Sequence, residues 1–108
     1  MATKQATVDY IIEQIAGVDD VSARKMFGEY ALYCGGKVVA LVCDEQLFLK
    51  PTKGGKAHIG KPALAPPYDG AKPYFLISGE QWDDADWLTD LIRLTAAELP
   101  IPKPKKQR

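Results

Sequence analysis

The sequence is poor in the residues from which catalytic and metal sites are usually built. Its 108 residues include one histidine, His58, and two cysteines, Cys34 and Cys43. The cysteines lack the paired spacing of a zinc site. No nucleophile or carboxylate stands beside His58 in the segment Lys53–His58, which makes it a poor acid–base site. We therefore predict no catalytic residue, no cofactor and no bound metal.

Long hydrophobic runs are missing as well. No apolar stretch approaches the roughly 20 residues of a membrane span, and the N-terminus lacks the apolar segment of a signal peptide. We expect a cytoplasmic protein with reduced cysteines. The formal net charge is 0, which argues against a general polyanion binder. Lysines nevertheless gather between positions 50 and 72, and acidic residues between 80 and 98.

The composition is that of an ordinary soluble globule, with 46% hydrophobic and 26% charged residues. We expect one folded domain over residues 1–99. Residues 100–108 alternate proline with cations, and this pattern excludes a helix and leaves no apolar partners. We predict a disordered basic tail there.

Helical spacing of apolar residues predicts two main helices. The first begins at Thr7 as N-cap and ends at Gly17, and the last runs from Asp83 as N-cap to about Leu99. A short helix is expected over residues 52–59. Ser22 is predicted to cap a single helical turn through residues 23–25.

Alternating residues predict a hairpin of strands 29–34 and 37–43 around the turn Gly35–Gly36. Pairing Cys34 with Lys37 places one apolar set on a shared core face: Tyr30, Leu32, Val39, Leu41 and Cys43. A two-residue turn at 44–45 would turn Phe48 toward that face, whereas a three-residue loop at 44–46 places Leu47 and Leu49 there. We predict the three-residue loop.

The opposite side of this sheet is also apolar, through Tyr33, Val38, Val42 and Phe48. Such a patch is larger than monomers usually expose, so we expect cover from a homodimer or from the irregular loop 60–72. A further strand is predicted over 73–78. The order of elements indicates an α+β two-layer domain, an antiparallel sheet with helices packed mainly on one face.

The two cysteines lie at opposite ends of the predicted hairpin, too far apart for a disulfide. We predict two free thiols, Cys34 as a surface thiol near the turn and Cys43 as a buried one.

Three other segments invite a chemical interpretation. The glycines in Lys53–His58 suggest a phosphate loop, but the spacing of that motif is absent, and a solvated loop is our prediction. The acidic residues of the last helix suggest a divalent ion, but capping and solubility explain them better: Asp83, Asp84, Asp86 and Asp90. Arg24 and Lys25 either contact an anion or an acidic partner, or they are one surface ion pair and one solvated lysine.

The junction between the first helix and the sheet carries the most specific pattern. It consists of Arg24, Met26, Phe27, Gly28 and Tyr30. We expect Met26 and Phe27 to fill core volume, Phe27 to anchor the junction and Gly28 to permit a turn. This stretch resembles the R-x-M-F-G-x-Y/F opening of the N-terminal domain of the TfoX/Sxy competence regulators. Residues 36–37, 47–50 and 73–75 are similar to later landmarks of that family.

The resemblance implies a non-enzymatic, stand-alone form of a small α+β domain. The family's members are bacterial regulators that help the cyclic-AMP receptor protein to activate competence genes, so a protein partner is expected. We predict an interaction surface from Lys25, Tyr33, Phe48, Lys53 and Lys56. One alternative is a nucleic-acid accessory protein that uses the basic 50–72 loop and the tail. The other is a small enzyme acting around His58.

Overall fold

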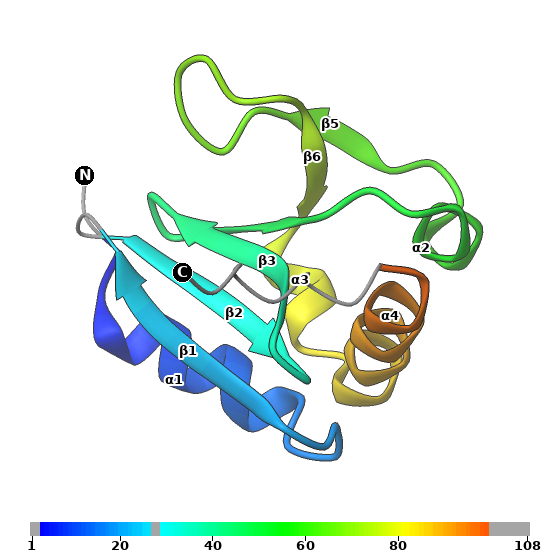
Figure 1. Ribbon diagram of the computed structural model, residues 1–108, viewed down its shortest axis with the longest axis horizontal. Helices are drawn as coiled ribbons and strands as arrows, with labels where there is room; N and C mark the ends of the chain where they lie inside the picture. The colour runs from blue at the N-terminus through cyan, green and yellow to red at the C-terminus, as the bar shows by residue number, and fades with distance from the viewer. Residues whose placement is uncertain (1–2, 27–28, 100–108) are drawn as a thin grey trace, which may run out of the picture.

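The computed structural model describes residues 3–26 and 29–99, which form one six-stranded antiparallel sheet and four helices (Figure 1). The elements in chain order are α1 (Gln5–Gln14), β1 (Val21–Met26), β2 (Glu29–Cys34), β3 (Lys37–Cys43), β4 (Gln46–Leu49), α2 (Lys53–Ile59), β5 (Ala63–Ala65), β6 (Tyr74–Ile77), α3 (Gly79–Trp82) and α4 (Ala85–Glu98). The predicted α+β class is confirmed.

The strand order in the sheet is β1-β2-β3-β4-β6-β5. The first four strands form a meander of sequential hairpins. The chain then leaves the sheet to form α2 and returns through β5, so that β6 pairs with β4 and β5 forms the far edge. β1 forms the other edge (Figure 1).

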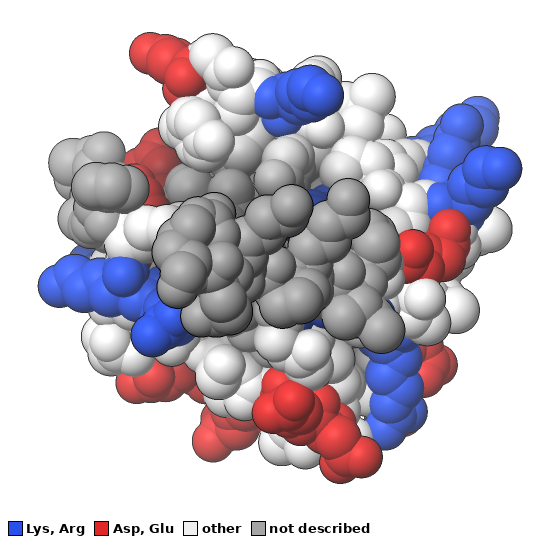
Figure 2. Space-filling model, in the orientation of Figure 1, with Lys and Arg blue, Asp and Glu red and all other residues white. Residues whose placement is uncertain are grey.

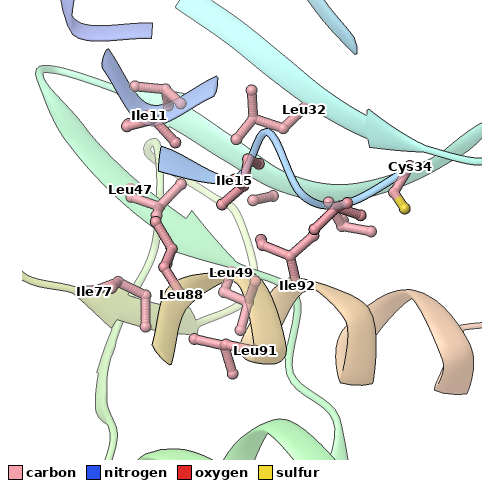
Figure 3. Close-up of a cluster of buried hydrophobic side chains, with 14 of the residues drawn as sticks. Ile11, Ile15, Leu32, Cys34, Leu47, Leu49, Ile77, Leu88, Leu91 and Ile92 are labelled. Atoms are coloured by element: carbon pink, nitrogen blue, oxygen red, sulfur yellow. The ribbon is translucent and has the colours of Figure 1, made fainter. Parts of the chain in front are cut away.

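The main core lies between the sheet and the helices α1 and α4. Side chains of both helices point toward strand residues in Figure 3, with Ile11 and Ile15 from the α1 region, Leu88 and Leu91 from α4, and Leu49 from β4. All five are fully buried. The half-buried tryptophans of α3 and α4 pack against the same cluster. Helices therefore cover one face of the sheet, as predicted.

A register shift between Leu32 and Tyr33 changes the predicted hairpin. Cys34 pairs with Lys37 as expected, but beyond the shift Leu32 pairs with Ala40 and not with Val39. The predicted core positions of Leu41 and Cys43 are wrong, because a one-residue slip moves every later residue of β3 to the other face. Val42 is correspondingly part of the main core.

The connection between β3 and β4 is a two-residue turn, since Cys43 pairs with Gln46. The predicted three-residue loop is wrong. Asp44 and Glu45 both adopt left-handed φ angles of 51° and 62°, as a tight hairpin turn requires. The bulge in the preceding hairpin offsets this second error. Leu47 and Leu49 reach the main core and Phe48 the opposite face, as predicted.

Two short strands stand where the sequence predicted a helical turn and an irregular loop. The turn of helix expected from Ser22 is β1, whose Arg24 and Lys25 are exposed. An edge strand with little apolar alternation is easily mistaken for a polar helical turn. β5 forms inside the predicted irregular loop 60–72, where Ala63 pairs with Leu76 of β6.

The predicted helix ends differ by a few residues. Lys4, not Thr7, is the N-cap of α1, and the helix ends before Gly17 with Ile15 as C-cap. Asp84, not Asp83, caps α4 and accepts a hydrogen bond from the Trp87 N–H at 3.1 Å. The expected short helix is α2, capped by Thr52.

The glycine pair in α2 has a packing reason. A Cβ atom at Gly55 would lie 2.8 Å from the Thr52 hydroxyl oxygen, with Leu91 and Thr95 of α4 at 3.6 Å. A side chain at this position would therefore collide with the capping hydroxyl of α2 itself, whereas α4 lies at ordinary contact distance. This explains a glycine here, although glycine weakens a helix intrinsically.

Three predictions fall outside the described residues. They are the anchoring role of Phe27, the turn at Gly28 and the tail 100–108.

Candidate interaction surface

The other side of the sheet carries a second apolar cluster made of strand residues. Its buried members are Ala31, Leu41, Cys43 and Phe48. Half-buried side chains from β2, β3, β5 and β6 pack against them. On β1 the residues that share this side are Ser22, Arg24 and Met26, because each pairs with a residue of β2 that faces it. We call this side the second face.

A groove of about 570 Å³ lies at one end of the second face. The residues that line it are Met26, Glu29, Tyr30, Leu41, Cys43, Pro67 and Tyr68. Pro67 and Tyr68 belong to the loop between β5 and β6, which projects past the sheet at the top of Figure 1. Met26 is 42% exposed and Tyr68 62% exposed. An apolar floor with large exposed side chains on opposite sides suits an apolar side chain of a partner.

The loop between β5 and β6 also tests the prediction that the second face is covered, either by the loop 60–72 or by a homodimer. Pro67 is buried and lines the groove together with Leu41 and Cys43. The loop therefore covers this end of the second face, as one of the two predicted alternatives required. A homodimer through the face stays a prediction.

Glu29 fixes the end of the groove where β2 begins. Its Oε1 accepts hydrogen bonds from the Thr3 N–H at 3.1 Å, the Thr3 hydroxyl at 2.6 Å and the Asp44 N–H at 3.1 Å. One carboxylate thus joins the N-terminal segment, β2 and the β3–β4 turn. These three hydrogen bonds to one oxygen keep the three segments together at this end of the groove.

The groove has a cysteine in its floor, but the thiol is a poor nucleophile. Burial raises the pKa of Cys43 to about 11, and the nearby carboxylates of Glu29 and Asp44 act in the same direction. Cys34 lies on the helix-covered side and is buried, so the predicted surface thiol is wrong. Burial also raises the pKa of Cys34. Both cysteines are free, as predicted.

The sequence motif at the junction divides between core and surface. Tyr30 is buried in the main core, and its hydroxyl donates to Gln5 Oε1 at 2.8 Å. Met26, expected in the core, is exposed at the groove instead. Arg24 is exposed two residues before it on the same side of β1.

Comparison with known proteins places this motif in a family context. The model of the TfoX N-terminal domain matches residues 13–99. The chain belongs to the TfoX N-terminal domain family. It is also 40% identical over 108 residues to an uncharacterized 12.7 kDa protein in the trpE 5′ region of Spirochaeta aurantia, covering all of this chain and 93% of that protein.

The five residues predicted to form an interaction surface in this TfoX-type domain do not lie together. Tyr33 and Phe48 belong to the second face. Lys25 is on the opposite side of β1, since it pairs with Tyr30. Lys53 and Lys56 are exposed on α2, which packs on α4 away from the second face. Pro67 and Tyr68 were not predicted, and their only sequence signal is an aromatic residue within a proline-rich loop.

The N-terminal amides of α2, in the segment that suggested a phosphate loop, already bind a carboxylate of the same chain. The backbone N–H groups of Lys53 and Gly54 donate to the carboxylate of Glu98 at the end of α4. These are the amides that a bound phosphate would use at a helix N-terminus. An internal carboxylate therefore stands where the phosphate-loop interpretation would place its anion.

His58 has a structural partner in the TfoX-type fold. Its Nε2 lies 3.0 Å from the Trp87 carbonyl oxygen, and its ring stacks on the Trp87 ring with centroids 5.2 Å apart. A carbonyl only accepts, so Nε2 donates in this contact. His58 thereby ties α2 to α4.

The acidic residues around the start of α4 have local roles. Asp83 accepts a hydrogen bond from the Tyr10 hydroxyl, Asp84 caps α4, and Asp90 lies 3.9 Å from Arg93. No group of three potential metal ligands occurs in residues 3–26 and 29–99. The prediction that capping explains these residues is confirmed for Asp84.

Charges of both signs occur on the face of the molecule that Figure 2 shows. Figure 2 shows Lys and Arg alternating with Asp and Glu around the margin of the face in view, without one continuous basic area. In the described part of the chain, no helix is long and apolar enough to cross a membrane.

Proposed function

We propose that this TfoX-type domain is a non-enzymatic protein-interaction module of bacterial transcription regulation, active in the cytoplasm. The observation that carries the proposal is the groove on the second face, whose rim holds the exposed family-motif residue Met26. Exposed methionine and tyrosine around an apolar floor are typical of protein interfaces.

The partner we propose is a protein that inserts one large apolar side chain between Met26 and Tyr68. Arg24 is exposed beside Met26, and its guanidinium makes no ion pair within the described residues. An acidic group next to the apolar side chain of the partner would therefore gain a charged contact. By family resemblance the first candidate is a component of the transcription machinery such as the cyclic-AMP receptor protein.

Affinity capture from the native cytoplasm, followed by titration calorimetry with each captured protein, tests this proposal. The test variants are Met26→Gln and Tyr68→Ser. The matched control is Leu94→Gln on α4, because Leu94 is 39% exposed and Met26 is 42% exposed. We expect each groove variant to weaken binding about tenfold, as loss of a central contact does. Equal affinities of the groove variants and the control would exclude the groove.

The nucleic-acid alternative makes a different prediction. We expect only weak, salt-sensitive binding, with Kd no tighter than about 10⁻⁵ M, measured by fluorescence anisotropy on random duplexes and single strands. Deletion of residues 100–108 should remove most of it. Binding tighter than about 10⁻⁷ M that survives the deletion would replace the protein-interaction proposal by the nucleic-acid one.

A further inference from the structure

Within residues 3–26 and 29–99, the outer edge of β1 has backbone groups without a partner. In this part of the chain β1 is an edge strand, and its one neighbour is β2. The Gly35 N–H donates to the Asp20 carbonyl at 3.0 Å across this pair. Hydrogen-bonded and non-hydrogen-bonded pairs alternate in an antiparallel ladder. The N–H and C=O groups of Val21, Ala23 and Lys25 therefore point away from β2, toward the open edge.

The side chains along this edge are charged in a self-complementary order. Asp19 and Asp20 precede the strand, and Arg24 and Lys25 stand near its end. All four are exposed, and none forms an ion pair within the described residues. Cations on an edge strand usually discourage pairing with other chains. Here the acidic residues at the other end of the same edge can form ion pairs with these cations in a second copy.

Antiparallel pairing with a second copy brings the opposite charges together. If Val21 pairs with Ala23 of the other copy, the turn residues Asp19 and Asp20 of one copy come to lie beside Arg24 and Lys25 of the other, twice by symmetry. The same register aligns the outward backbone groups, because Val21 and Ala23 both point to the open edge. Ser22 lies on the two-fold axis, where a small side chain permits close approach.

We propose that this chain forms a two-fold dimer by pairing β1 with β1 of a second copy, which joins two six-stranded sheets into one. Directly paired residues share a face, so the helices of both copies lie on the same side of the joined sheet. The residues that line the groove lie outside the paired segment 19–25, so the groove itself stays free in each copy. Arg24 is shared: in the dimer it faces the acidic turn of the other copy, and in the monomer it is available to the proposed partner.

Sedimentation velocity of the purified chain tests the dimer, because pairing of one short strand buries a small interface. We expect a Kd on the order of 10⁻⁵ M at low salt, weakened at least tenfold by about 0.5 M NaCl. A chain that remains monomeric at about 0.5 mM and low salt would overturn the proposal.

Charge exchange distinguishes this arrangement from other dimers. One variant carries Arg24→Glu and Lys25→Glu. The other carries Asp19→Lys and Asp20→Asn, because asparagine tolerates the left-handed φ of 60° at position 20. Each variant alone should dimerise at least tenfold more weakly, since like charges then meet at both ends. An equimolar mixture should recover dimerisation. A dimer that neither variant weakens, or a mixture without recovery, would exclude β1 pairing.

Amide hydrogen exchange gives an independent measurement on the unmodified chain. The amides of Val21 and Ala23 should become protected as protein concentration rises, whereas those of Ser22 and Arg24 are protected by β2 at every concentration. Uniform protection of all four, independent of concentration, would contradict the proposal.

Discussion

The two faces of the sheet are built from similar apolar residues but are packed in different ways. On one face Leu32, Leu47 and Leu49 meet the helices α1 and α4 and are fully buried. On the other, strand residues pack among themselves and leave Met26 exposed beside a groove. The contrast indicates a division of labour: the helix-covered face supplies stability, and the second face is available for contacts. Four predictions test this division.

The largest effect is expected from truncation of the main core. Leu49→Ala should lower the free energy of unfolding by about 2–5 kcal/mol, because it leaves a cavity under α4. Leu76→Ala on the second face should cost only about 1 kcal/mol, since Leu76 is half-exposed. Urea denaturation of both variants measures the difference. Equal losses would show that both faces contribute alike.

The helix layer itself should be sensitive to added volume. Gly55→Ala is expected to destabilise the domain by about 1–3 kcal/mol, because the new methyl group would displace Thr52 from its capping position. Gly79→Ala is the control, since a Cβ atom there meets nothing within 4 Å. Thermal denaturation of both variants decides. A neutral Gly55→Ala would mean that Thr52 can move aside, and its cap be lost, at little cost.

The two cysteines report on the two faces separately. At pH 8 the thiolate fraction of Cys43 should be roughly 200-fold below that of an ordinary thiol, given its pKa of about 11. A thiolate becomes somewhat more nucleophilic as its pKa rises, and this offsets part of the loss. We therefore expect native-state alkylation to be at least tenfold slower than alkylation in urea, and less than roughly 200-fold slower. The denatured chain should show two reactive thiols. Rapid native labelling of Cys43 would mean that the groove opens to solvent.

The smallest effect concerns the turn between β3 and β4. The pKa of Glu45 is lowered because its carboxylate accepts hydrogen bonds from the Thr7 hydroxyl and the Lys4 N–H. Its stabilisation is therefore present above the pKa of the unfolded chain, near 4.3, and is lost as pH falls through the lower pKa of the folded chain.

Glu45→Gln should accordingly be less stable than the wild type at pH 7, and the difference should shrink below about pH 4. Urea denaturation at several pH values measures this. Glu13→Gln serves as the control, because Glu13 is exposed on α1 and has no side-chain hydrogen bond within the described residues. A pH-independent difference for Glu45→Gln would show that the charge of the carboxylate does not contribute to stability.

The sequence predicted those features of the fold that local patterns determine. Alternation identified Leu47 and Leu49 as core residues and Phe48 as their opposite. The bulge was not predictable, because the extra residue on β3 is Val39, which lies between the partners of Tyr33 and Leu32, and valine is not a residue type that marks a bulge. The left-handed turn at Glu45 depends on partners more than 35 residues away, Lys4 and Thr7.

The candidate site was predicted only in part for the same reason. Met26 belongs to the motif that was recognised, but its exposure follows from its place on an edge strand. Tyr68 reaches the groove only because β6 pairs with β4 and brings the preceding loop across the sheet. Relations between distant segments decide the site, and single-residue patterns do not carry them.

The strand order has a consequence for how the chain folds during synthesis. β1 to β4 are consecutive hairpins, which form quickly because their contacts are local. The helix that covers Leu47 and Leu49 is α4, which follows every strand of the sheet. A nascent chain therefore presents a finished meander whose apolar face is covered by α1 in part and lacks the cover of α4 until that helix emerges. In that interval the domain is most exposed to aggregation and most dependent on chaperones.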